Sequence, residues 1–285
     1  MPPNDTASDA KKAAETLLWW SAAEVSFTVG EQPRDHFAAL DSVPDRPETA
    51  RAAPPPPERR PASLPVARRE PAALVGAPAQ VAAAELAAAA QDLASLEAEL
   101  QRFEGCALKR TATQLVFSDG VPGSRVMMVG EGPGADEDRI GRPFVGRAGQ
   151  LLDRMLAAIG LDRAHVYIAN VVPWRPPGNR TPTPEETQIC LPFVRRQIEL
   201  ADPEILVCLG ALSAQTLLGV KSGITRARGS WLTYQRDDGR PIQAIPMLHP
   251  AYLLRQPAQK RAAWADMRTL AAALREGTGA AVGAQ

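Results

Sequence analysis

Two short stretches bring together residue types that could do chemistry. The first, 130–149, reads GEGPGADEDRIGRPFVGRAG and follows the apolar run 126–129. Glycine lets a backbone approach a ligand closely, and Phe144 offers it a flat face. The stretch lacks the Gly-Lys-Ser/Thr ending of a phosphate loop and the spacing of a dinucleotide fingerprint. Contact with a flat ligand is one interpretation, and a core phenylalanine among solvated acids is the alternative.

The second stretch is 249–255, HPAYLLR. His249 directly follows an apolar run, and an imidazole there could donate a hydrogen bond to charge developing on a ligand. Leu253 and Leu254 beside Arg255 have the pattern of an exposed apolar wedge that enters a DNA stack. A histidine helix cap followed by core leucines is the alternative, which the stretch taken alone favours.

Polar residues also follow a third apolar run, VYIAN, which ends at Asn170. The amide of Asn170 offers an acceptor and two donors, so it could read a base edge or stabilise a loop. The following WRPPGNR places Arg175 and Arg180 on a rigid loop, where they could bind phosphates or face solvent.

These residues would be positioned by alternating strands and helices. Short apolar runs predict buried parallel strands at 125–129, 165–172, 204–209 and 242–247. Helical spacing predicts helices at 147–159, 183–200, 211–218 and 257–275, with Thr183 as an N-cap. The fold class is therefore α/β: a three-layer α/β/α domain with a central, mostly parallel four-stranded sheet. The loops at 130–138, 173–183, 210–214 and 248–255 should meet at the carboxyl edge of that sheet.

A partly disordered N-terminal extension should precede this domain. Residues 1–43 contain a possible helix at 8–23, whose Trp19-Trp20 pair suggests a protein partner. Residues 44–80 are rich in proline and predict a disordered linker. The main domain should span 81–277 and open with a helix at 82–103, and 278–285 should form a flexible tail.

Composition narrows the classes of partner. Residues 1–100 carry 9 Lys/Arg against 15 Asp/Glu, whereas 101–285 carry 23 against 17. The basic part suits a polyanion such as nucleic acid, although an ordinary solvated surface explains the excess equally well. The three cysteines and the absence of an apolar leader or bilayer-length run predict a cytoplasmic protein without membrane association. We expect it to be a monomer.

Taken together, three motifs resemble those of the family 4 uracil-DNA glycosylases. They are GEGPGADEDRIGRPFVGRAGQLLDRML, VYIANVVPWRPPGNRTPTPEE and HPAYLLR, and the resemblance covers about residues 100–275. It implies an enzyme that flips uracil out of uracil-containing DNA and hydrolyses its N-glycosidic bond. A non-catalytic DNA-binding or scaffolding protein with the same fold is the main alternative. A small-molecule nucleoside hydrolase would need neither the arginine loop nor the leucine wedge.

The resemblance also implies a role for each motif residue. Phe144 would stack on uracil, Asn170 would read N3–H and O4, and His249 would stabilise charge on O2. Either Glu131 or Glu137 would align water, and the other would crowd the position of the thymine methyl. The backbone around the base would come from Gly130, Glu131, Gly132 and Gly134. DNA would be contacted by Arg175, Arg180, Leu253, Leu254 and Arg255.

The chain departs from the family at its cofactor. Family 4 enzymes hold a 4Fe-4S cluster with four cysteines, of which this chain matches two, Cys106 and Cys190. The other two positions carry Phe103 and Trp174, which supply no ligand. Cys208 lies inside a predicted strand and is expected to be a core residue. We therefore predict no metal and no cofactor, with Cys106 and Cys190 as vestiges of the cluster site.

Overall fold

The computed structural model describes residues 77–276. Four expectations lie outside the described residues: the helix at 8–23 with its tryptophan pair, the N-terminal segment 1–43 as a whole, most of the linker at 44–80, and the tail at 278–285.

The centre of the fold is a six-stranded sheet with the order β1-β3-β2-β4-β6-β5. Its four inner strands are parallel, as predicted: β2 (Val126–Gly130), β3 (Val166–Asn170), β4 (Ile205–Leu209) and β6 (Pro241–Met247). The prediction of four strands was incomplete, because short antiparallel strands flank them on both edges. These are β1 (Asp119–Gly120), paired with β3, and β5 (Leu232–Gln235), paired with β6.

The inner strands are apolar on both faces because helices cover both sides of the sheet. Met127 and Val129 of β2 join one buried cluster, and the alternate residues Val126 and Met128 join the other. This period of two matches the pleat of a strand, and it explains why the strands read as continuous apolar runs in the sequence.

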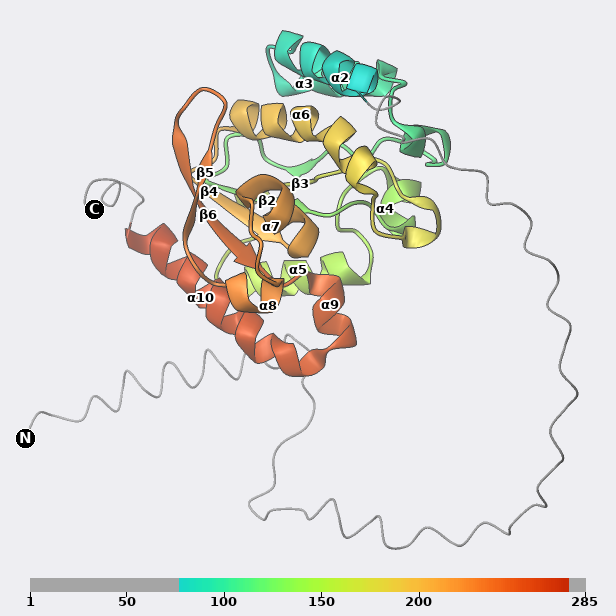
Figure 1. The fold of residues 1–285 in the computed structure, drawn as a ribbon. Coiled ribbons are helices and arrows are strands. Elements are labelled where there is room, and N and C mark those ends of the chain that lie inside the picture. Colours follow the sequence, from blue (N-terminus) through green and yellow to red (C-terminus); the bar gives the residue numbers. More distant parts are fainter. Residues whose placement is uncertain (1–76, 277–285) are drawn as a thin grey trace, which may run out of the picture. The chain divides into compact units, whose positions relative to one another are not determined.

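Helices form the two outer layers (Figure 1). One layer holds α6 (Pro184–Ala201) and α7 (Ala211–Leu218), with α2 (Ala77–Ala89) and α3 (Leu93–Arg102) stacked on α6. The other holds α5 (Arg147–Ala157), α9 (Pro250–Arg255) and α10 (Lys260–Glu276). Two short helices, α4 (Ala135–Ile140) and α8 (Ile224–Ala227), lie in connections between strands. At the start of α6, Thr183 forms the predicted capping box with Glu186.

The single helix expected at 82–103 is two helices. The chain turns at 90–92, where the Asp92 carboxylate caps α3 by accepting from Ser95 N–H at 2.7 Å. The Arg196 guanidinium of α6 donates to the Ala90 carbonyl at 2.7 Å, which ties the turn to the domain. Helix α2 packs on α6, and Ala79 lies against the core, so packed residues occur before position 81, where the sequence predicted the domain to start.

Between residues 77 and 276, no helix combines the length and the apolar character that a membrane crossing requires.

Candidate active site

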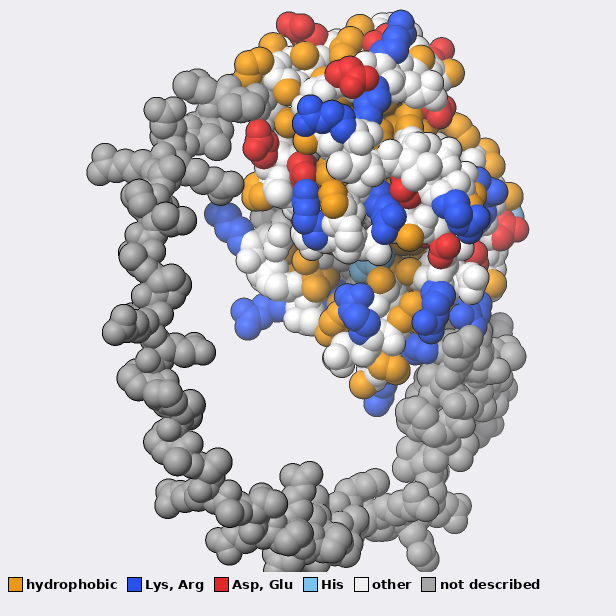
Figure 2. Space-filling model, turned by 90° about the vertical axis from the view of Figure 1, so that its right-hand side faces the viewer, with side chains coloured by type: hydrophobic (Ala, Val, Ile, Leu, Met, Phe, Trp, Pro, Cys, Tyr) orange, Lys and Arg blue, Asp and Glu red, His pale blue; other side chains and the backbone are white. Residues whose placement is uncertain are grey.

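A pocket of about 550 Å³ lies at the carboxyl edge of the sheet, and all four predicted loops contribute to it. Figure 2 shows a face of the molecule on which Lys and Arg side chains surround a hollow. The residues that line the pocket are Glu131–Gly134, Glu137, Phe144, Ala148, Asn170, Pro176, Asn179–Pro182, Gly210, Ala211, Ile224, Leu248, His249, Ala251, Tyr252 and Arg255. The convergence of the four loops is therefore confirmed.

Gly130 at the end of β2 and Gly132 just after it are required because side chains from other segments press against their backbone. A Cβ on Gly130 would lie 2.5 Å from Asn170 Oδ1 and 2.6 Å from Phe144 Cζ. A Cβ on Gly132 would lie 2.7 Å from Val172 Cγ2. All three distances are too short for real atoms, so glycine is what lets the pocket side chains come together here.

Phe144 is held in an unusual backbone conformation beside the pocket. Its φ is +55°, in the left-handed region, and its side chain is buried. The Arg163 guanidinium donates to the Phe144 carbonyl, and a Cβ on Gly149 would overlap that carbonyl. The ring of Phe144 stacks on the imidazole of His249, with centroids 5.4 Å apart and planes 27° apart. The backbone thus fixes the orientation of an aromatic face that lines the pocket.

Asn170 ends β3, as predicted, and its side chain is only 5% exposed. Its Oδ1 is buried without a hydrogen-bond partner among the described residues. An unpaired buried amide oxygen costs free energy unless something donates to it. In a pocket, a ligand N–H is the group that would satisfy it.

His249 is the N-cap of α9, and its Nδ1 accepts from Ala251 N–H at 3.1 Å. That bond places the ring proton on Nε2, which makes Nε2–H a donor. Burial, with a smaller contribution from the Arg255 charge, lowers the pKa of His249 from 6.5 to about 4. The imidazole is therefore neutral near pH 7.

Glu131 is a partly buried carboxylate at the same pocket. Burial raises its pKa above the ordinary value of 4.5, while a Thr181 hydrogen bond and the Arg255 charge act in the opposite direction. These two neighbours stabilise the ionised form and oppose the larger effect of burial on the pKa of Glu131.

Glu137 also lines the pocket, but both of its oxygens serve the loop. Oε1 accepts from Val145 N–H and Gly146 N–H, each at 2.9 Å, and Oε2 accepts from Gly134 N–H at 3.1 Å. The carboxylate therefore fastens the start of α4 to the segment that follows Phe144. Of the two candidate acids, Glu137 is committed to three backbone hydrogen bonds, so Glu131 is the freer one to bind a ligand or water.

Three of the predicted DNA-binding residues are arginines near the pocket. Arg255 is exposed at the pocket, and Arg180 lines it while donating two hydrogen bonds to Glu186 at 2.8 and 2.6 Å. Arg175 lies on the same loop and donates to Asn179 Oδ1 at 2.7 Å. Both loop arginines are thus held in place by neighbours, as a preorganised cation would be.

The leucine wedge needs correction. Leu253 is completely buried in the core, and Leu254 is partly buried against it. The stretch after His249 is helix α9 and not an open loop, with Pro250 at its first position. The helix-cap alternative was therefore right for Leu253, although His249 itself also lines the pocket.

Sequence reasoning missed several lining residues. Gly210 and Ala211 lie on a predicted loop but were not singled out, and Gly210 has a φ of +97° beside His249. Thr181 directly follows Arg180, and Tyr252 lies three residues after His249 in HPAYLLR, so closeness in the sequence could have indicated that both line the pocket.

Comparison with known proteins identifies the family to which the chain belongs. The uracil DNA glycosylase superfamily matches residues 117–268, which include every pocket residue. The chain belongs to this superfamily.

The chain aligns with most of the length of several relatives in this superfamily. The chain is 45% identical over 160 residues to the type-4 uracil-DNA glycosylase of Thermotoga maritima, which is 55% of this chain and 80% of the relative. It is 38% identical over 184 residues to that of Archaeoglobus fulgidus, covering 63% and 92%. It is 40% identical over 170 residues to that of Pyrobaculum aerophilum, covering 59% and 87%.

The residues at the cluster positions do not fit an iron–sulfur cluster. Cys106 and Cys190 lie close together, with their sulfur atoms 3.8 Å apart, but Phe103 and Trp174 are buried in the same apolar cluster. No group of three or more His, Cys, Asp or Glu residues suited to a metal occurs between residues 77 and 276. Two thiols cannot supply the four ligands that such a cluster takes.

Proposed function

We propose that this protein is a DNA-repair glycosylase that hydrolyses the bond between uracil and deoxyribose in DNA and leaves an abasic site. The observation that carries the proposal is that one pocket contains both a buried hydrogen-bond acceptor, unpaired among the described residues, and a hydrogen-bond donor. Asn170 presents an unpaired acceptor, and His249 carries its proton on Nε2 and can donate. The superfamily membership and the type-4 relatives support the same reaction.

Asn170 would select uracil through its N3–H and O4. The free Oδ1 accepts from N3–H, and the amide NH₂ donates to O4. Cytosine has an acceptor at N3 and a donor at C4, so it would leave both amide groups buried and unpaired. A site built on buried polar groups discriminates strongly for this reason. The Phe144 ring, fixed by its backbone, would stack on the base.

His249 would stabilise the departing uracil. As the glycosidic bond breaks, negative charge develops on the base, and the Nε2–H of the neutral imidazole would donate to O2. The lowered pKa of His249 keeps the imidazole neutral. A neutral imidazole stabilises the departing base by a hydrogen bond, whereas an imidazolium would transfer its proton to the base more readily.

Glu131 would align the attacking water. The ionised carboxylate accepts a hydrogen bond from water and stabilises positive charge on the sugar in an oxocarbenium-like transition state. Because its pKa is raised, the carboxylate is protonated at a higher pH than an exposed glutamate. Excision should therefore decline on acidification through that raised pKa, and Glu131→Gln should remove this decline.

DNA would be held by two arginines that line the pocket, Arg180 and Arg255, and by Arg175 on the same loop as Arg180. Arg175, Arg180 and Arg255 are suited to phosphates on either side of a flipped nucleotide. We also propose that the protein acts in the cytoplasm as a monomer, without a metal or another cofactor.

The test is direct. Purified protein is incubated with a duplex oligonucleotide that carries one uracil, abasic sites are cleaved with alkali, and the shorter strand is measured. Matched oligonucleotides with thymine or cytosine at that position should stay intact. If the protein binds the uracil duplex but yields no product, it is a binding protein and the proposal is wrong.

A further inference from the structure

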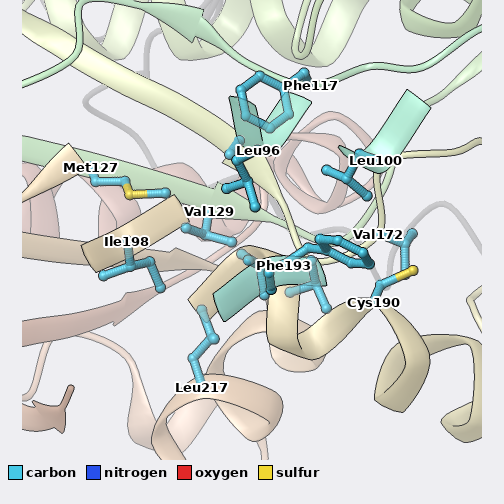
Figure 3. Close-up of a cluster of buried hydrophobic side chains, with 14 of the residues drawn as sticks. Leu96, Leu100, Phe117, Met127, Val129, Val172, Cys190, Phe193, Ile198 and Leu217 are labelled. Carbon is cyan, nitrogen blue, oxygen red and sulfur yellow. The ribbon is translucent and has the colours of Figure 1, made fainter. Parts of the chain in front are cut away.

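One apolar cluster of the domain contains three aromatic residues and two cysteines, here together named the aromatic anchor. It consists of Phe103, Cys106, Trp174, Cys190 and Phe193, none of which is more than 5% exposed. All five belong to one continuous apolar cluster between the sheet and the α2, α3 and α6 layer, part of which is drawn in Figure 3.

The anchor joins three separate segments of the chain. The ring of Phe103, just after α3, packs edge-on against Phe193 of α6 with centroids 5.2 Å apart. Cys190 of α6 donates its S–H toward Cys106, across 3.8 Å. Gly105 has no room for a side chain, because a Cβ there would meet the Phe103 ring. The segment 103–106 is therefore closely packed around the Phe103 ring, which lies against Phe193.

The third segment leads directly into the pocket. Trp174 is followed by residues 176 and 179–182, which form one wall of the pocket. The Pro173 carbonyl accepts from Val116 N–H at 2.9 Å, which fixes the start of this segment. At its far end, Arg180 and Thr183 bond to Glu186, one turn before Cys190 on α6. The far end of the wall is therefore attached to α6, which carries Cys190 and Phe193, and its start follows Trp174 directly.

We propose that the aromatic anchor holds the pocket wall in place without iron. Trp174 is a positioning residue: its buried ring fixes the wall at 176–182, while the wall residues contact the DNA. This deepens the proposed glycosylase function and rests on it for the identity of the substrate. The Cys106–Cys190 pair contributes packing and a weak hydrogen bond, and no metal ligation.

The first measurement concerns the parent protein alone. Protein purified without oxygen should be colourless and should contain neither stoichiometric iron nor acid-labile sulfide. This readout does not depend on any activity. Brown protein with about four irons per chain would overturn the proposal, because a cluster of that size takes a full ligand set at this place.

The second measurement compares Trp174→Ala with Leu217→Ala, a control from the same apolar cluster on α7, remote from the wall in sequence. Both changes empty a buried site, and Trp174→Ala should lower the melting temperature by roughly 6–20 °C. Below the melting temperature, amide hydrogen exchange at 176–182 should accelerate in Trp174→Ala only. Equal exchange at the wall in both variants would show that Trp174 is merely a core residue.

Trp174→Phe supplies the rescue and covers the case in which the alanine variant does not fold. It should return wall exchange to near the parental rate. On a uracil oligonucleotide, kcat/KM should fall roughly tenfold in Trp174→Ala, as a displaced binding wall would cause, and recover in Trp174→Phe. Loss of excision in the parent would refute the proposed function but leave the exchange and iron results to decide the anchor.

Discussion

The pocket and the aromatic anchor share the loop 173–183, but the pocket is polar and strained, whereas the anchor is apolar and unstrained. The pocket contains an unpaired amide oxygen on Asn170, a neutral His249 surrounded by protein, and a left-handed Phe144. The anchor contains rings and thiols, and none of its residues has a positive φ. The pocket thus holds an unmet hydrogen bond and a strained residue, whereas the anchor is held by apolar packing. Substitutions in the two regions should therefore separate activity from stability.

The largest expected effect is on the rate of excision in the pocket. His249→Ala removes one preorganised donor and should lower the excision rate by about 10²–10³-fold, with DNA affinity nearly unchanged. Single-turnover kinetics on a uracil oligonucleotide measures this. His165→Ala is the matched control, because His165 is an exposed histidine paired with Asp162. Equal rates for the two variants would remove His249 from the mechanism.

A second effect concerns stability, and it also comes from His249. The pKa is about 4 in the folded protein, against 6.5 for an unperturbed histidine, so the unfolded chain binds the proton between those values. The neutral His249 therefore contributes its full share to the free energy of unfolding above pH 6.5. That contribution, about 3 kcal/mol, is lost as the pH falls toward 4. Urea unfolding at pH 7 and pH 4 should show this extra loss in the parent and not in His249→Gln. Identical pH dependence in both would contradict a buried, neutral imidazole.

A smaller effect tests the division of labour between the two glutamates. Glu137→Gln replaces one of two accepting oxygens and should cost about 1–2 kcal/mol of unfolding free energy. Excision should fall less than tenfold, because the carboxylate organises the loop and does not meet the substrate. Asp136→Asn on the exposed side of α4 is the control. A rate loss of a hundredfold in a protein of parental stability would show that Glu137 is catalytic.

The smallest effect is electrostatic. Arg175→Ala or Arg180→Ala should weaken binding to all DNA sequences and reduce the salt dependence by about one unit of slope. Affinity is measured at several salt concentrations. Arg102→Ala is the control, because Arg102 is an exposed arginine of α3 that forms an ion pair with Glu99, and it should leave the slope unchanged. A parental slope for both loop variants would mean that this loop faces solvent.

The sequence predicts those parts of the fold that depend on residues close together in the chain. Four apolar runs predict the parallel strands, and Thr183 with Glu186 predicts the start of α6, because a strand face and a cap are decided within a few residues. The edge strand β1 has two residues, too few for any periodicity, and its pairing with Tyr167 and Ile168 is a matter of tertiary structure.

The site divides in the same way. The motifs single out Asn170 and His249, which the fold brings to one pocket. The burial of Leu253 depends on helix α9 lying against α5, which no spacing within HPAYLLR specifies. Glu137 bonds to backbone groups eight and nine residues ahead, so its structural role becomes visible only once the loop is folded.

The order of the strands has a consequence for how the chain folds as it is synthesised. The first parallel strand to be made, β2, ends in the centre of the sheet, where Val126 pairs with Val166 on one side and Ile205 on the other. When β3 has emerged, one edge of β2 still waits for β4, and β4 waits for β6. Distant pairings of this kind form slowly. The pocket draws its first residue from Glu131 and its last from Arg255, so the nascent chain acquires a place for a base only after nearly all of the domain has left the ribosome.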